Sequence, residues 1–278
     1  MTAIISKEDM QKFAVTGKIG LISTISPFGE PHITLITSIQ AKDEKTIMWG
    51  QFTHGLSKEY VNKNPLTGFL VLNLEKKWWR GKTEYRDSTE TGEDFDMYNN
   101  QPLFRYNTYF GVGRVHYMDL KDFSGKQDLP MGGIIKGALL GKMIKPFVKP
   151  SPDGIKKIKG ISVKLAKDLT SLKFLSYIDE EGFPVLLPVL QATMKDEGRI
   201  YIPLTAYGEE IKKIKPGSKV ALFYANLELS SVLFQGYFTG IEKKLGVSYA
   251  IFDISKVYNS MVPIPGYIYP MEPYSVVH

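Results

Sequence analysis

The second half of the chain repeats the pattern of the first half, and this repeat limits the possible folds more than any other feature. Residues 19–31 read IGLISTISPFGEP and residues 172–184 read LKFLSYIDEEGFP, so a Gly-x-Pro turn recurs after 153 positions. The segments IMWGQFTHG (47–55) and IYIPLTAYG (200–208) match at the same spacing. Order and register agree over roughly 70 residues, which indicates a divergent duplication and not a chance match of turns.

Each repeat has the pattern of a small antiparallel β-barrel. A helical segment precedes each copy (6–17 and 159–171), and strand-like runs follow, joined by connections short enough for hairpins. Closure of such strands into a barrel removes exposed strand edges. We therefore predict a mainly β fold, with two tandem antiparallel β-barrels and flanking helices, packed as a pseudo-dimer within one chain.

The strand after the first Gly-x-Pro turn is expected to run unbroken through HITLITSIQ (32–40). Alternation would place Ile33, Leu35, Thr37 and Ile39 on one face and the residues between them on the other. Both faces are then partly apolar, as in a barrel wall with a packed interior and a covered exterior.

The predicted domains are a first barrel (1–120), a basic connector (121–160) and a second barrel (161–278). Between Gly133 and Lys173 there are ten lysines and two aspartates, a net charge of +8, so the rest of the chain sums to −2. The absence of arginine there argues against a nucleic-acid surface. A solvated connector is the simplest interpretation, and contact with an anionic surface or a partner is the alternative. Some apolar residues of the connector fall at helical spacing: Ile134, Ile135, Ala138, Leu139 and Met143.

Several kinds of chemistry are excluded by what the sequence lacks. There is no cysteine, which removes disulfides and thiolate sites. The four histidines are not paired at metal-ligand spacing, so we predict no metal site. We find neither a signal peptide nor a run of apolar residues long enough to cross a membrane, and we expect a cytoplasmic protein. The segment Asp94–Asp96 could orient a catalytic base, but it is interpreted as an acidic loop.

One short stretch carries donors suited to a phosphate. In WGQFTHGLSKEYVNKNP (49–65), Thr53, Ser57 and Lys58 supply two hydroxyls and an ammonium at the start of a predicted helix. A helix N-terminus adds free N–H groups and the positive end of its dipole. The alternative is that Ser57 is only the N-cap of the helix and Lys58 is solvated. Spacing alone does not separate the two interpretations.

The barrel pattern, the Gly-x-Pro hairpin, W-G-x-F-T-x-x-x-S-K and the following N-P together resemble the pyridoxamine 5′-phosphate oxidase-like, FMN-binding split-barrel superfamily. The resemblance covers residues 10–87 well and residues 163–258 more weakly, as a second copy. It implies a split barrel that binds FMN, with the phosphate at Thr53, Ser57 and Lys58. It further implies that the flavin ring lies along the backbone of one strand, with two nearby contacts and two candidate arginines: Thr34, Leu35, Ile36, Thr37, Gly50, Gln51, Arg80 and Arg105. For Arg105, a surface loop with packed aromatic residues is the alternative. Trp49 is expected in the core.

The sequence departs from that family in two places. Members that oxidise pyridoxamine phosphate carry arginine and lysine where this chain has Thr34 and Ile39. The second repeat reads AYGEEIKK at the phosphate position, with Ala206 for the threonine and with Glu209 and Glu210 nearby. Carboxylates repel a phosphate. We therefore expect one FMN per chain, at the interface of the two barrels, with the second barrel as a wall.

The leading hypothesis is an FMN-dependent oxidoreductase of the pyridoxamine-phosphate-oxidase or flavin-reductase type, in which the flavin carries the redox chemistry on an unknown small substrate. No catalytic residue is assigned. A non-catalytic flavin-binding or sensing module, a binder of another planar cofactor (F420 or haem), and a cofactor-free structural protein are the alternatives. We expect no nucleic-acid partner, and a further homodimer is left open.

Overall fold

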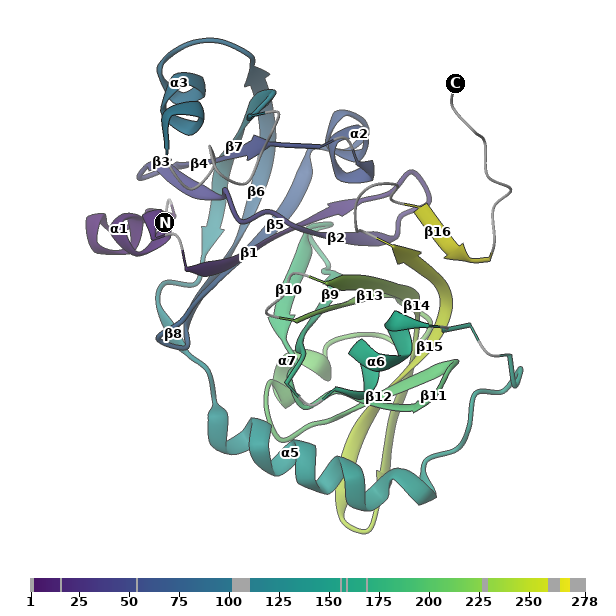
Figure 1. The fold of residues 1–278 in the computed structure, drawn as a ribbon. Helices are drawn as coiled ribbons and strands as arrows, with labels where there is room; N and C mark the ends of the chain where they lie inside the picture. The colour runs from purple at the N-terminus through teal and green to yellow at the C-terminus, as the bar shows by residue number, and fades with distance from the viewer. Residues whose placement is uncertain are drawn as a thin grey trace. The chain divides into compact units, whose positions relative to one another are not determined.

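The computed structural model describes residues 3–15, 17–53, 55–101, 111–155, 157–158, 160–168, 170–226, 230–259 and 266–270. The chain divides into two compact units (Figure 1). Unit 1 comprises Met1–Gly29, Ile33–Leu129 and Asp179–Leu186, and unit 2 comprises Glu30–His32, Pro130–Ile178 and Leu187–His278. The domain boundaries given above stay a prediction.

The first sheet is antiparallel, and its strands follow the order β2-β1-β5-β6-β7-β4-β3, with β8 paired to β6. Its strands are β1 (Lys18–Ile25), β2 (Pro31–Leu35), β3 (Gln40–Asp43), β4 (Thr46–Gln51), β5 (Leu66–Asn73), β6 (Lys77–Thr89), β7 (Arg114–Phe123) and β8 (Gln127–Asp128). The helices of this part of the chain are α1 (Lys7–Ala14), α2 (Leu56–Lys63) and α3 (Glu93–Asn100).

The second sheet has the same order, β10-β9-β13-β14-β15-β12-β11, with β16 paired to β15. Its strands are β9 (Leu172–Ile178), β10 (Pro184–Pro188), β11 (Thr193–Asp196), β12 (Arg199–Pro203), β13 (Lys219–Ala225), β14 (Ser231–Lys244), β15 (Val247–Asn259) and β16 (Gly266–Tyr269). The helices here are α5 (Met131–Ile144), the 3₁₀ turn η1 (Lys145–Phe147), α6 (Ile161–Lys167) and α7 (Gly208–Ile211). Two eight-stranded antiparallel sheets with flanking helices confirm the predicted fold class.

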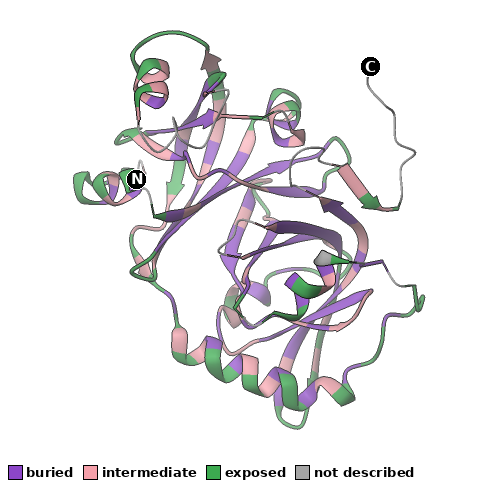
Figure 2. Cartoon of the chain, in the orientation of Figure 1, coloured by how far each residue is buried: buried purple, intermediate pink, exposed green. Residues whose placement is uncertain are grey.

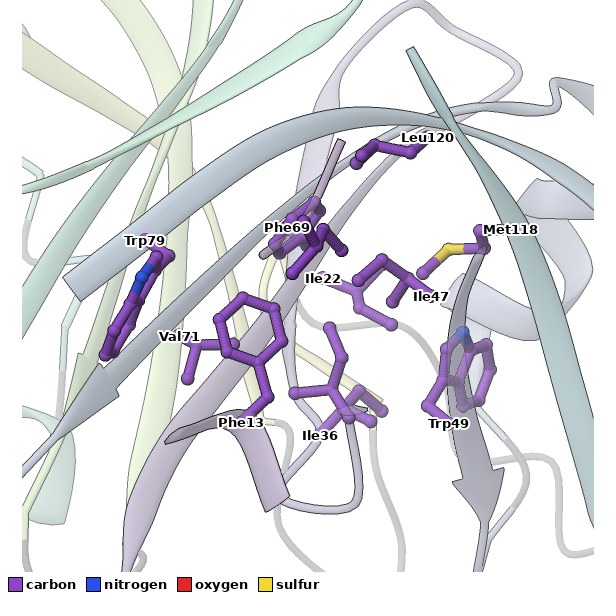
Figure 3. Close-up of a cluster of buried hydrophobic side chains, with 12 residues drawn as sticks. Phe13, Ile22, Ile36, Ile47, Trp49, Phe69, Val71, Trp79, Met118 and Leu120 are labelled. Carbon is purple, nitrogen blue, oxygen red and sulfur yellow. The ribbon is translucent and has the colours of Figure 1, made fainter. Parts of the chain in front are cut away.

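The core of unit 1 shows why these sequences form strands. Along β4, Ile47 and Trp49 point to a large apolar cluster, while Met48 between them joins a separate cluster with Tyr98 of α3. This period of two is the mark of a strand covered on both faces. Figure 3 shows the larger cluster, in which the ring of Phe13 from α1 lies among side chains of several strands. The predicted core position of Trp49 is confirmed, since only 1% of this residue is exposed.

The prediction of one unbroken strand over 32–40 is wrong. β2 ends at Leu35, and the chain then turns, with the N–H of Ile39 donating to the carbonyl of Ile36 at 3.2 Å. The N–H of Ile36 donates to the carbonyl of Gly20 at 2.7 Å, and a Cβ at Gly20 would overlap the Ile36 carbonyl. This close approach lets Ile36 and Ile39 both enter the core, which the alternating pattern had placed on opposite faces.

The acidic segment Asp94–Asp96 is also not a loop, because it forms the first turn of α3. Carboxylates are favourable at the positive end of a helix dipole. Asp94 pairs with Lys42 and accepts a hydrogen bond from the hydroxyl of Tyr117 at 2.8 Å. These contacts with β3 and β7 hold the pKa of Asp94 below its usual value, so this carboxylate serves the packing of α3 on the sheet.

The predicted helix in the connector is confirmed as α5, which ends at Ile144 before η1. Three of its glycines, Gly133, Gly137 and Gly141, lie against the second sheet and the loop that follows β12. A Cβ at Gly133 would overlap the carbonyl oxygen of Thr205, and one at Gly141 would lie 3.0 Å from the hydroxyl of Thr193. None of the described helices is both long and apolar enough to span a membrane.

Candidate functional site

The start of α2 places two of the predicted phosphate donors. The N-cap of this helix is Gly55, which makes no side-chain capping bond, and Ser57 and Lys58 are the second and third helical residues. The interpretation of Ser57 as the N-cap is therefore wrong. Its buried hydroxyl instead pairs with the hydroxyl of Thr34 on β2. One hydrogen bond thus joins two residues that the sequence had assigned to the same cofactor.

Lys58 is a half-buried cation with no ion pair or hydrogen bond to any residue that the structure describes. Its ammonium lies 5.7 Å from the centre of the Trp49 ring and 3.7 Å from the position that a Cβ of Gly55 would take. A cation over an aromatic face gains some attraction, but less than a carboxylate or phosphate would give. Burial lowers the pKa of Lys58 to about 8. The charge is held in place without a counter-ion from the described chain.

A stacked pair of rings lies next to this cation. Trp49 and His116 are directly opposite in the pairing of β4 with β7, and their ring centres are 3.9 Å apart at an interplanar angle of 10°. The Nε2 of His116 lies 2.8 Å from the Oε1 of Gln51, so Nε2 is the donor. Burial first, then the charges of Lys58 and Arg114, lower the pKa of His116 to about 3, which keeps the imidazole neutral.

Two buried polar atoms of this ring pair have no hydrogen-bond partner among the described residues: Nδ1 of His116 and Nε1 of Trp49. Buried polar groups are normally paired, so such atoms mark places where a ligand or water completes the structure. Sequence reasoning missed His116 because it looked for histidines near one another along the chain. The signal was weak: His116 shares the inner face of its strand with Met118, and only the pairing with β4 brings it to Trp49.

Gly50 and Gln51, predicted near the flavin ring, differ in what they offer. The Ser38 hydroxyl donates to the Gly50 carbonyl at 2.8 Å and accepts from its N–H at 3.1 Å. A Cβ at Gly50 would lie 2.9 Å from Val112, so this glycine permits a tight packing contact. Gln51 ends β4 and carries the side chain that holds His116.

The backbone predicted to follow the flavin edge is that of β2 and the turn after it. Both backbone groups of Ile36 are engaged inside the unit, as described above. Peptide groups alternate in direction along a strand, so those of Leu35 face away from β1. β2 stands at the end of the sheet order, so no described strand of the first sheet pairs with Leu35 on that side, which we call the open edge.

The remaining predicted residues are spread out. Thr53 is exposed in the loop before α2, and Thr37 is half-buried in the turn after β2. The guanidinium of Arg80 lies 5.6 Å from the centre of the Trp78 ring and donates to the carbonyl of Leu186 at 3.4 Å. Arg105 lies outside the described residues. The structure therefore brings Thr34, Ser57 and Lys58 to one place, next to Gln51 and the Trp49–His116 pair.

The corresponding loop of unit 2 is covered. Ala206, which replaces the threonine, is buried, and its carbonyl accepts a hydrogen bond from the side-chain amide of Gln191 at 3.1 Å. Helix α5 packs on this loop through Gly133 and Gly137, whose Cβ atoms would meet Thr205. At the positions that correspond to Ser57 and Lys58, this loop has Glu210 and Ile211.

No protein-family profile matches the sequence, and no curated protein matches it. Among solved structures, the chain is similar to HupZ of Group A Streptococcus, with 13% identity over 43% of this chain and 92% of that chain, at a TM-score of 0.36. It is also similar to an FMN-binding protein from Syntrophomonas wolfei (16% identity, 43% and 82% covered, TM-score 0.35) and to the styrene monooxygenase flavin reductase from Pseudomonas putida (10%, 44% and 87%, TM-score 0.27). Each match covers less than half of this chain. We therefore base the functional proposal on contacts within this chain.

Proposed function

We propose that unit 1 binds FMN, with the phosphate held at the N-terminus of α2. The observation that carries the proposal is Lys58, a half-buried ammonium with no counter-ion among the described residues. Burying an unpaired charge is costly, and such a charge persists where a ligand of opposite sign completes it. A phosphate monoester has the required charge and several acceptor oxygens.

The neighbouring groups fit the same ligand. Ser57 and Thr34 present two hydroxyls on the same side of α2, and each hydroxyl can donate to a phosphate oxygen once their mutual bond opens. The exposed residue Thr53 lies two positions before Gly55, the N-cap of α2, and its hydroxyl is a further donor. The N–H of Lys58 donates to the carbonyl of Gly55 at 3.1 Å, so the N–H groups of Leu56 and Ser57 are the ones that precede the first bond of the helix and add further donors.

For the flavin ring, the open edge at Leu35 offers one N–H and one carbonyl on a rigid strand. We assign this residue, with Thr34 and Thr37 beside it, to the ring edge, and we assign Ile36 and Gly50 to packing. Gln51 acts on the site indirectly, through its hydrogen bond with His116 of the Trp49–His116 pair. One FMN per chain is proposed, and the expectation that the second barrel walls the site stays a prediction from the sequence.

When bound, FMN supplies hydride or electron transfer. The chain's own residues bind and orient it. The neutral His116 has its Nε2 proton committed to Gln51, so we give it a positioning role beside the site and assign it no proton transfer. Oxidoreductase activity on a small molecule is the proposed outcome, and cytoplasmic location remains part of the proposal.

The test compares two lysines of the same helix. Lys58→Glu removes the unpaired cation, whereas Lys63→Glu makes the same charge change at the exposed last turn of α2. FMN and riboflavin are titrated against each purified variant by flavin fluorescence. We expect Lys58→Glu to weaken FMN binding by roughly 100-fold or more while leaving riboflavin affinity unchanged, because a buried charge pair is replaced by repulsion. We expect Lys63→Glu to bind both ligands like the wild type.

Equal losses of FMN and riboflavin affinity would contradict the phosphate assignment. Wild-type protein that binds no flavin would overturn the proposal as a whole. The absorption spectrum of the native protein, with the cofactor identified by mass, separates FMN from F420 and haem. Consumption of a nicotinamide donor by FMN-loaded protein separates an oxidoreductase from a binding or sensing module.

A further inference from the structure

Helix α5 of unit 2 carries large apolar side chains on its outer face. Ile135, Leu139 and Met143 recur every fourth residue and are 55%, 64% and 47% exposed, and Phe147 of η1 continues the row at 53%. We call these four residues the α5 ridge. In Figure 2 the outer side of α5 is largely exposed while its inner side is buried. A water-facing helix of a globular protein normally shows the reverse distribution.

The α5 ridge cannot be turned inward, because glycines fix the opposite face of the helix. Ile134, Gly137, Gly141 and Ile144 are buried, and on a helical wheel they lie opposite Leu139. A Cβ at Gly137 would overlap the hydroxyl of Thr205. The helix therefore sits flush on the sheet, and its large apolar side chains stay outside by construction.

Lysines border the α5 ridge on both sides. On the helical wheel, Lys142 falls beside Ile135 and Lys136 falls beside Met143, with Leu139 midway between them. Lys145 and Lys149 follow near Phe147, and residues 131–150 contain no acidic residue. An apolar strip between lysines, with no carboxylate, matches the boundary between acyl chains and anionic headgroups.

The tip of the β14–β15 hairpin extends this surface. The hairpin leaves the sheet next to α5, because Ile144 and Val148 share an apolar cluster with Val247 and Tyr249 (Figure 1). Leu245 at its tip is 62% exposed and follows two exposed lysines, Lys243 and Lys244. Two segments far apart in sequence thus present the same combination of apolar and basic side chains at one end of unit 2.

We propose that the α5 ridge and the β14–β15 tip dock on the surface of an anionic lipid bilayer. The charge pattern decides between occupants. A second copy of the chain would bring two lysine-rich α5 surfaces together, which like charges oppose, whereas anionic headgroups neutralise them. Helix α5 has only 14 residues and is packed on a sheet, so we expect it to lie along the bilayer surface and not to cross the bilayer. This inference is independent of the flavin site.

The experiment is co-sedimentation of the full chain with vesicles. Vesicles of phosphatidylcholine alone are compared with vesicles in which roughly one-third of the lipid is phosphatidylglycerol. We expect binding to the anionic vesicles only, and we expect it to weaken as salt rises, because salt screens the lysines. Wild-type protein that stays in solution with the anionic vesicles overturns the proposal.

Two pairs of substitutions separate the apolar and basic contributions. Ile135→Gln with Leu139→Gln should reduce binding to anionic vesicles at least roughly tenfold, because it removes the apolar side chains that enter the headgroup boundary. Lys136→Gln with Lys142→Gln should reduce it several-fold, because two headgroup contacts are lost. All four side chains are exposed, so thermal unfolding should match the wild type.

The matched control is Lys212→Gln with Lys213→Gln, two exposed lysines that directly follow α7 of the same unit. This variant should bind vesicles like the wild type. If it loses as much vesicle binding as Lys136→Gln with Lys142→Gln does, net charge alone explains the loss, and the assignment to α5 is overturned. Sedimentation velocity without lipid tests the other occupant. If the wild type is a dimer and the variant Ile135→Gln with Leu139→Gln is a monomer, the α5 ridge serves self-association and the proposal is overturned.

Discussion

Lys58 determines the chemistry available at the start of α2. Its ammonium is desolvated enough to lower its pKa to about 8, yet no described carboxylate approaches it. The nearest ring system, Trp49 stacked on the neutral His116, offers an attractive face but no charge. A bound phosphate would supply the missing charge and raise the pKa of Lys58, because the charged form then gains a partner.

That difference in pKa predicts how FMN binding depends on pH. Above about pH 8 the free protein loses the Lys58 proton, whereas the complex, with its raised pKa, keeps it. Binding then requires uptake of one proton, so the Kd should rise by up to about tenfold per pH unit above pH 8 and be flat just below it. Flavin fluorescence titrations at a series of pH values measure this directly.

Lys58→Arg is the control for the pH effect, because a guanidinium stays protonated throughout this range. Its Kd should be independent of pH between about 7 and 10. A wild-type Kd that is also flat across pH 8 would show that the ammonium does not contact the ligand.

Some of the site at the residue scale could be predicted from the sequence, and some could not. Ser57 and Lys58 are neighbours in the chain, so predicting that both lie at the start of α2 required only the position where the helix begins. The bond between Thr34 and Ser57 and the stack of His116 on Trp49 depend on which elements meet in space. Local pattern does not encode such pairings. The possible N-cap role of Ser57 was wrong because α2 begins at Leu56, with Gly55 as its N-cap.

At the scale of elements, the adjacent glycines Gly132 and Gly133 of α5 allow a matched test of packing. A Cβ at Gly132 meets nothing within 4 Å, whereas one at Gly133 would overlap the carbonyl oxygen of Thr205. Gly132→Ala should therefore raise the free energy of unfolding by up to about 1 kcal/mol through helix propensity. Gly133→Ala should lower it by roughly 1–3 kcal/mol, because a backbone atom cannot move aside cheaply.

Urea unfolding of the two variants, followed by circular dichroism, measures both changes in the free energy of unfolding. Equal effects of the two substitutions would mean that α5 is not seated on the second sheet through this face. The same result would remove the reason for the outward position of the α5 ridge, so the measurement also bears on the proposed lipid surface.

Strands and helices could be predicted where the spacing of apolar residues showed which face of the element is buried. The period of two in β4 and the helical spacing in α5 both survive in the structure. β2 was predicted too long because the close approach at Gly20, which lets the chain turn after Leu35, is invisible in an alternating pattern. α3 was interpreted as a loop because its acidic residues find partners, Lys42 and Tyr117, only on other elements.

Across the whole chain, the two sheets repeat each other down to single hydrogen bonds. The N–H of Ile36 donates to Gly20, and 153 residues on, the N–H of Val189 donates to Lys173 at 2.8 Å. The repeat was readable because turns and strand order tolerate sequence change. The two copies also diverge: at the position of Gly20 the second sheet has the buried Lys173, whose ammonium donates to the carbonyl of Ala192 at 2.9 Å.

The divergence predicts that the chain binds one flavin and not two. The scaffold of the phosphate loop is present in both repeats, but Ala206, Glu209 and Glu210 replace its donors in the second, and α5 covers Thr205. Titration of FMN at protein concentrations well above the Kd should therefore end at one equivalent per chain, and Lys58→Glu should abolish that end point. An end point at two equivalents would contradict the assignment, since two carboxylates beside a dianion raise its energy, and the ammonium of Lys212 is already paired with Glu209 at 2.6 Å.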